Sequence, residues 1–161
     1  MRPEEAKRLS LTSPVPPAIQ GALAEGRISA SALDHYRTFA RRYPFPFDDF
    51  QDRAILAVLE GRSVIVSAPT GAGKTLVAEF AIHDALRAKK RLAYTTPLKA
   101  LSNQKYADFC RQFGVAEVGL LTGDVKVNPR APVLVMTTEI LRNMFYTGTL
   151  PGLAHVVLDE R

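Results

Sequence analysis

The chain has 161 residues, of which 47% are hydrophobic and 23% are charged, and its formal net charge is +5. The single cysteine excludes an internal disulfide, and no apolar run approaches the roughly 18 residues of a membrane span. The first residues are charged and interrupted by prolines, without the apolar core of a secretory signal. We therefore expect a cytoplasmic protein of ordinary globular composition.

The positive charge is concentrated in one stretch. Residues 84–130 contain nine lysines or arginines and four acidic residues, which accounts for the whole net charge. A local basic excess suits contact with phosphate groups. Charge alone leaves open the alternative of a solvated surface without a partner.

Residues 1–43 differ from the rest of the chain. Prolines interrupt the start, and residues 18–43 predict one or two short helices, the second capped by Ser29 or Ser31. We expect this segment to be a helical lead-in and not a catalytic unit, with the main domain covering residues 44–161.

Short apolar segments alternate with amphipathic ones from there on. We expect strands over residues 63–68, 91–96, 117–123, 132–138 and 155–160, and helices over residues 48–61, 76–89, 98–113 and 139–148. In the first of these helices, Phe50, Ala54 and Val58 are expected to share the buried side. This alternation is typical of βαβ units and predicts an α/β fold with a parallel sheet.

The stretch APTGAGKT, residues 68–75, falls between the first expected strand and its helix. It fits the phosphate-loop pattern GxxxxGK[ST], except that Ala68 replaces the first glycine. Such a loop turns its backbone N–H groups onto phosphate oxygens, while the lysine reaches the β- and γ-phosphates and the hydroxyl ligates Mg²⁺. The predicted nucleotide contacts are Thr70, Gly71, Ala72, Gly73, Lys74 and Thr75. An accidental glycine turn is the alternative.

The last expected strand delivers Asp159 and Glu160. A carboxylate at the carboxyl end of a parallel strand lies on the ligand-binding edge of such a sheet. We expect Asp159 to hold Mg²⁺, through water, and Glu160 to orient or deprotonate the attacking water. Together with Lys74 they are the predicted catalytic residues. The alternative is a pair of polar residues that simply ends a strand.

Several motifs follow one another in the order of a known family. The phosphate loop is followed by TTPLKALSNQKYADF at residues 95–109, LLTGD at 120–124, MTTEILRNMF at 136–145 and the acidic pair. This series resembles superfamily 2 helicases of the DExH type, and within them the superkiller-type branch of large RNA helicases. The resemblance implies a RecA-like domain that uses ATP and Mg²⁺ to move along single-stranded RNA. A DNA-directed helicase of the same superfamily and a nucleotide- or nucleic-acid-binding module without turnover are the alternatives.

The stretch FPFDDFQ, residues 45–51, is similar to the adenine-recognition motif of that branch. The resemblance implies that Phe45 stacks on adenine and that Gln51 hydrogen-bonds its edge, for which an amide offers both a donor and an acceptor. In the alternative interpretation, Phe45, Phe47 and Phe50 are core residues and Gln51 lies on the helix surface.

The remaining motifs imply a track for the nucleic-acid strand. Hydroxyls, loop N–H groups and helix N-termini grip phosphates without reading bases. The contacts implied by the resemblance are Pro97, Lys99, Ala100, Gln104, Thr122, Gly123, Thr138, Glu139 and Arg142. Local capping is the alternative for each; Thr138, for example, could cap the helix that follows it.

The chain also departs from the family pattern. Arg161 occupies the third position of a DExH motif, and we expect the given sequence to lack the second RecA-like domain, with its arginine for the transferred phosphoryl group. We also expect it to lack the strand that separates the acidic strand from the phosphate-loop strand in this class. We therefore expect an incomplete sheet with open edges, and a fragment that is inactive alone and prone to aggregate.

Overall fold

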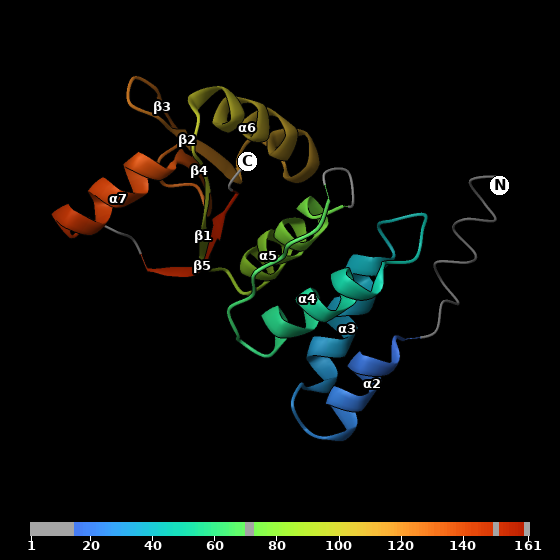
Figure 1. The fold of residues 1–161 in the computed structure, drawn as a ribbon. Coiled ribbons are helices and arrows are strands. Elements are labelled where there is room, and N and C mark those ends of the chain that lie inside the picture. Colours follow the sequence, from blue (N-terminus) through green and yellow to red (C-terminus); the bar gives the residue numbers. More distant parts are fainter. Residues whose placement is uncertain (1–14, 70–72, 150–151, 160–161) are drawn as a thin grey trace. The chain divides into compact units, whose positions relative to one another are not determined.

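The computed structural model of the chain describes residues 15–69, 73–149 and 152–159 (Figure 1). The chain divides into two compact units, Met1–Ala81 and Ile82–Arg161. Helix α5 (Thr75–Arg87) runs from the first into the second. Within the described residues, no helix is long and apolar enough to span a membrane.

The first unit is built from helices. They are α2 (Pro17–Ala24), α3 (Ala30–Ala40), α4 (Asp49–Leu59) and the first turns of α5. Proline at the first position starts α2, and the Ser29 hydroxyl accepts a hydrogen bond from the Ala32 N–H at 3.1 Å to start α3. Gly61, at φ +72°, follows the end of α4. Two helices are therefore present where one or two were predicted, and Ser29, not Ser31, caps the second.

These helices share one apolar core. Ile19 from α2, Phe39 from α3 and Ile55 from α4 are fully buried, and Phe80 from α5 packs in the same cluster. The ring centroids of Phe39 and Phe80 are 5.1 Å apart in an edge-to-face arrangement. The lead-in helices consequently cover the helices that carry the adenine-recognition and phosphate-loop motifs.

A polar contact inside this unit joins α3 to α4. The Tyr36 hydroxyl donates to Asp52 Oδ1 at 2.7 Å, and both side chains are buried. Burial raises the pKa of the Asp52 carboxyl and of the Tyr36 hydroxyl.

The prediction of the buried side of α4 was only partly right. Ala54 is buried, but Phe50 and Val58 are half-buried, and the neighbouring positions face the core instead.

The strand expected over residues 63–68 is wrong. These residues form no strand, and Ile65 is 96% exposed. An apolar run becomes a strand only when a neighbouring strand accepts its backbone hydrogen bonds. No strand of the described sheet takes that place.

The second unit is a five-stranded sheet in the order β3-β2-β4-β1-β5. Its strands are β1 (Arg91–Thr96), β2 (Val118–Leu121), β3 (Lys126–Val127), β4 (Val133–Thr137) and β5 (Leu153–Leu158). All pairings are parallel except that of β2 with β3, a short exposed hairpin that the sequence did not predict. The mixed α/β fold with a mostly parallel sheet confirms the predicted fold class and is consistent with part of a RecA-like domain.

Helices α6 (Lys99–Phe113) and α7 (Thr138–Thr147) pack on this sheet (Figure 1). Tyr94 of β1 meets Phe109 of α6, whereas its neighbour Ala93 belongs to the cluster with Leu141 of α7. Because neighbouring strand residues point to opposite faces, the two helices cover opposite faces of the sheet. Strand β5 is at the end of the strand order, and Val156 and Leu158 on it are 43% and 58% exposed.

An exposed apolar edge strand is expected to drive self-association. Val156→Lys should reduce the concentration-dependent association of the protein in light scattering, because a lysine on an edge strand opposes pairing with another chain. The unfolding free energy should change by no more than about 0.5 kcal/mol, since the site is exposed.

Val115→Lys is the matched control for this change. Val115 is 71% exposed and lies outside the strands, so the same added charge should leave the association unchanged. Equal effects of the two lysines would assign the association to net charge instead of the β5 edge.

Candidate nucleotide and nucleic-acid sites

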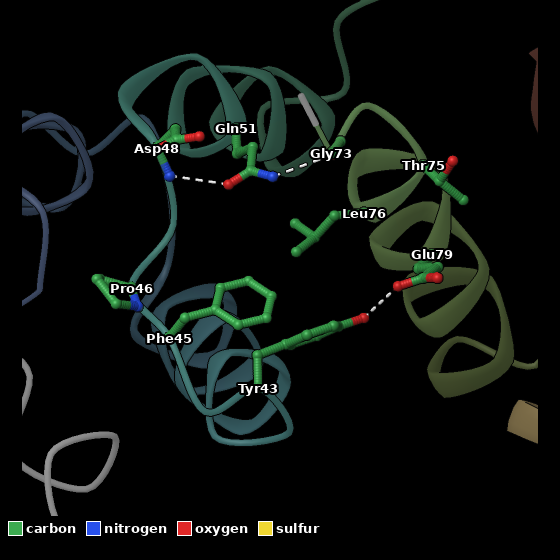
Figure 2. Close-up of a pocket in the computed structure, with 9 residues that line it drawn as sticks. All are labelled: Tyr43, Phe45, Pro46, Asp48, Gln51, Gly73, Thr75, Leu76 and Glu79. Atoms are coloured by element: carbon green, nitrogen blue, oxygen red, sulfur yellow. Dashed lines mark hydrogen bonds between the residues drawn. The ribbon is translucent and has the colours of Figure 1, made fainter. Parts of the chain in front are cut away.

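A pocket of about 480 Å³ lies in the first unit, next to the start of α5 (Figure 2). It brings together aromatic, amide, glycine and carboxylate groups from the segment before α4, from α4 itself, from the loop before α5 and from α5. The residues that line it are Tyr43, Phe45, Pro46, Asp48, Gln51, Gly73, Thr75, Leu76 and Glu79. Two predicted groups, the adenine-recognition motif and the end of the phosphate loop, therefore meet at one hollow.

Phe45 is the exposed aromatic residue of this pocket. Its side chain is 50% exposed, and its ring centroid is 5.6 Å from that of Tyr43. Phe47, by contrast, is half-buried, and its ring centroid is 5.7 Å from that of Phe39 in the core. The core interpretation thus fits Phe47 but not Phe45, whose open face can stack on a planar base.

Gln51 is buried, with 4% of its surface exposed, so the surface alternative for this residue is wrong. Its Oε1 accepts a hydrogen bond from the Asp48 N–H at 2.8 Å, and its Nε2 donates to the Gly73 carbonyl at 3.1 Å. Figure 2 shows this bridge across the top of the pocket. Gln51 therefore connects the start of α4 to the phosphate loop.

Glycine is favoured at position 73 for two reasons. Its φ is +83°, a region that side chains rarely adopt, and a Cβ there would lie 2.5 Å from Gln51 Nε2. Thr70, Gly71 and Ala72 lie outside the described residues. Lys74 and Thr75 are half-buried at the start of α5, where the Leu76 N–H donates to the Gly73 carbonyl at 3.2 Å.

Asp159 follows the end of β5 in the second unit. Its N–H donates to the Thr95 carbonyl at 2.9 Å, and its Oδ2 accepts a hydrogen bond from the Tyr94 hydroxyl. The predicted neighbour Glu160 lies outside the described residues. Carboxylate and hydroxyl oxygens, such as those of Asp159 and Thr75, are the hard donors that Mg²⁺ prefers.

The described residues contain no group of three or more His, Cys, Asp or Glu side chains that could hold a metal ion.

The residues predicted to contact the nucleic-acid strand lie at one edge of the β-sheet. Since β1, β2, β4 and β5 run parallel, their carboxyl ends lie side by side. Pro97 and Lys99 follow β1, Thr122 follows β2, Thr138 follows β4, and Asp159 follows β5. The pairing of the strands thus aligns these three motifs with the acidic residue.

The surface residues of this edge are open to a partner. Pro97, Lys99, Ala100 and Gln104 are exposed, as are Gly123, Glu139 and Arg142. Lys99 forms an ion pair with Asp124, and its hydrogen bond lowers the pKa of the Asp124 carboxyl. Arg142 Nη2 is 3.9 Å from Glu139 Oε1. A bound phosphate would compete with Asp124 for Lys99.

Two threonines on this edge are held differently. Thr122 is 7% exposed, and its hydroxyl donates to Asp124 Oδ1 at 3.3 Å. Thr138 is the first residue of α7, whose N-cap is Thr137. The Thr138 hydroxyl is buried and has no hydrogen-bond partner within the described part of the chain, so it does not cap the helix.

Sequence reasoning missed three residues at these sites. Tyr43 and Glu79 line the pocket and hydrogen-bond each other, and Tyr94 contacts Asp159. A signal existed for Glu79, which lies one helical turn after Thr75 and so shares its side of α5. For Tyr94, the expected parallel pairing could have placed it near the carboxyl end of β5.

Comparison with known proteins gives consistent matches. A family model described as DEAD/DEAH box helicase matches residues 48–161. The chain is 57% identical over 124 residues to the "Probable helicase HelY" of Mycobacterium tuberculosis, covering 76% of this chain and 14% of that protein. It is 54% identical over 123 residues to the "ATP-dependent RNA helicase mtr4" of Schizosaccharomyces pombe, covering 75% and 11%. It is also 54% identical over 123 residues to the "Exosome RNA helicase MTR4" of Mus musculus, covering 75% of this chain and 12% of that protein. The chain thus spans only a small part of the length of these relatives.

Gly73→Ala should weaken nucleotide binding by about 10-fold or more, because the added methyl group displaces Gln51 and strains the loop; a tenfold change corresponds to about 1.4 kcal/mol. Titration with a fluorescent ATP analogue measures this. Gly61→Ala is the matched control, since Gly61 has a similar φ of +72° but open space around its Cβ position. Both variants should lose about 1–2 kcal/mol of stability from the positive φ. Equal loss of nucleotide affinity in both would contradict a specific role for the Gly73–Gln51 contact.

Proposed function

We propose that this chain is the ATP-binding portion of an ATP-dependent RNA helicase. The premise is that the chain belongs to the DEAD/DEAH box helicase family. In the intact protein, ATP hydrolysis would drive movement along single-stranded RNA and unwinding. The observation that carries the proposal is the pocket in which exposed Phe45, buried Gln51 and the end of the phosphate loop meet.

The pocket supports a division of roles among its residues. The open ring of Phe45 would stack on adenine, and Gln51, with donor and acceptor groups at one end, would hydrogen-bond its edge. Thr70, Gly71, Ala72 and Gly73 would present backbone N–H groups to the phosphates, and Lys74 would reach the β- and γ-phosphates.

Thr75 and Asp159 are the proposed holders of Mg²⁺, which when bound would neutralise charge on the phosphates. Glu160 would orient the water that attacks the γ-phosphate. Lys74, Asp159 and Glu160 are thus the proposed catalytic residues.

The edge of the sheet at the carboxyl ends of its β-strands supports a proposed path for the nucleic-acid strand. Exposed groups from three motifs line this edge, and phosphate contacts by such groups are independent of base sequence. The contacts are Pro97, Lys99, Ala100, Gln104, Thr122, Gly123, Thr138, Glu139 and Arg142. We favour RNA because two of the relatives are named RNA helicases. A DNA-directed helicase is the second candidate.

We further propose that residues 1–43 are a helical lead-in to a RecA-like domain that begins at residue 44. The relatives are much longer than the matched region, which is consistent with a second RecA-like domain elsewhere in the intact protein. On this proposal the chain alone is inactive as an ATPase. A module that binds nucleotide or nucleic acid without any catalytic partner is the alternative.

Steady-state ATPase measurements with single-stranded RNA, with single-stranded DNA of the same sequence, and without nucleic acid test the function. RNA should stimulate turnover by the intact protein more than DNA does. Lys74→Ala should lower turnover by about 10²- to 10³-fold, because it removes a positive charge aimed at the transferred phosphoryl group. Stronger stimulation by DNA would favour the DNA-directed candidate. Binding without turnover in the intact protein would favour the non-catalytic module.

Lys99→Ala should weaken RNA binding and lower the slope of log Kd against log salt by about 0.7, the value for one phosphate contact on a single strand. Asp124→Asn should strengthen binding, because it removes the carboxylate that competes for Lys99. Lys126→Ala is the control, since Lys126 is an exposed lysine of β3 outside the predicted contacts. Fluorescence anisotropy of labelled RNA at several salt concentrations measures all three. Equal losses for Lys99→Ala and Lys126→Ala would indicate binding by general charge and not by this track.

A further inference from the structure

We propose that Tyr94 is a positioning residue, whose buried hydroxyl orients the Asp159 carboxylate for the Mg²⁺ that accompanies the nucleotide. This inference rests on the proposed function, because it assigns to Asp159 the task of holding that ion. It concerns contacts inside the second unit alone.

The register of the sheet brings the two side chains together. Tyr94 of β1 pairs with Val157 of β5 in parallel, and Asp159 is two residues further along. Residues two apart on a strand point to the same face, so Asp159 is the diagonal neighbour of Tyr94. The Tyr94 hydroxyl donates a hydrogen bond to Asp159 Oδ2, and the Asp159 N–H is fixed on the Thr95 carbonyl at 2.9 Å. Backbone and side chain of Asp159 are thus both held by β1.

The ring of Tyr94 is itself fixed. Tyr94 and Phe109 of α6 are each 1% exposed, and their ring centroids are 5.0 Å apart at an interplanar angle of 78°. An edge-to-face pair buried in this way has little freedom to turn. The hydroxyl therefore has a defined position at the end of a rigid side chain.

The chemistry of the pair suits an orienting role. A phenol donates one proton, whereas a carboxylate has about four lone-pair sites, so Tyr94 can hold one oxygen while the group retains the capacity to bind a cation or its water. Hydrogen bonds from a second layer of residues orient metal-binding side chains, and their loss typically lowers metal affinity by about 10- to 100-fold.

The hydroxyl is not required to hold the two strands together. β1 and β5 are joined by their backbone ladder, and the Thr95 hydroxyl adds a hydrogen bond to the Val157 carbonyl at 3.1 Å. A phenylalanine ring would fill the same space against Phe109. The contribution specific to tyrosine is its contact with Asp159.

Tyr94→Phe tests the proposal, because it removes only the hydroxyl. The affinity of the protein for a fluorescent ATP analogue is measured in EDTA and over a titration of Mg²⁺, which gives the gain in affinity that the ion provides. Tyr94→Phe should leave the affinity in EDTA unchanged and raise the Mg²⁺ concentration at half-maximal gain by about 10- to 100-fold. Asp159→Asn sets the effect of losing the carboxylate charge.

Two further variants separate positioning from structure. Tyr106→Phe removes the hydroxyl of another tyrosine of this unit, which contacts Cys110, and should leave the Mg²⁺ dependence unchanged. Thr95→Val removes the side-chain bond between β1 and β5; it should lower the unfolding free energy without changing the Mg²⁺ dependence.

The outcomes distinguish this inference from the function on which it rests. A wild-type Mg²⁺ dependence in Tyr94→Phe, or nucleotide binding by the wild type that ignores Mg²⁺, would overturn the inference and leave nucleotide binding intact. A Mg²⁺ dependence altered equally in Thr95→Val would also overturn it, since the effect would then be structural. A wild-type protein that binds no nucleotide would overturn the proposed function, and this inference with it.

Discussion

The parallel pairing of β1 with β4 on one side and β5 on the other is the constraint on which the second unit depends. Parallel strands place their carboxyl ends at one edge, so residues far apart in the sequence become neighbours there. The Asp159 N–H extends this pairing beyond β5 onto the Thr95 carbonyl. The acidic residue is therefore held by the same strand whose end carries Pro97 and Lys99.

The first unit depends on burial instead of strand pairing. Its lead-in helices contribute Ile19 and Phe39 to the core that also contains Ile55 and Phe80. Because α4 carries the buried Gln51 and α5 starts at the phosphate loop, this core supports both sides of the pocket. The segment that precedes the family motifs is consequently part of the structure that shapes this pocket, the candidate nucleotide site.

Local pattern predicted most of the fold. Residues 91–96 were predicted as a strand and form one with the same bounds, because a short apolar run between helices has few other options. The run at residues 63–68 is at least as apolar but forms no strand and is mostly exposed, since hydrophobicity alone cannot supply a partner strand. β3 was not predicted, because an exposed strand of two residues shows no pattern of apolar residues. The family predicted from the motifs is confirmed by the match over residues 48–161.

The candidate sites were predictable in their residue types and less so in their contacts. The motifs named Phe45 and Gln51 together, but Gln51 also hydrogen-bonds Gly73, 22 residues away along the chain. Tyr94 and Asp159 are 65 residues apart, and only the register of the sheet brings them into contact. Contacts of this range depend on how the elements pack, which no local pattern encodes.

The bridge from Asp48 through Gln51 to Gly73 has a consequence for how a ligand is sensed. One side chain spans the region expected to receive the base and the loop expected to receive the phosphates, so a rearrangement of either one disturbs a hydrogen bond of Gln51. The binding free energies of adenosine and of inorganic triphosphate should then not be additive. Occupation of the base region would preorganise the loop, and the protein would discriminate a whole nucleotide from its parts by cooperativity between them.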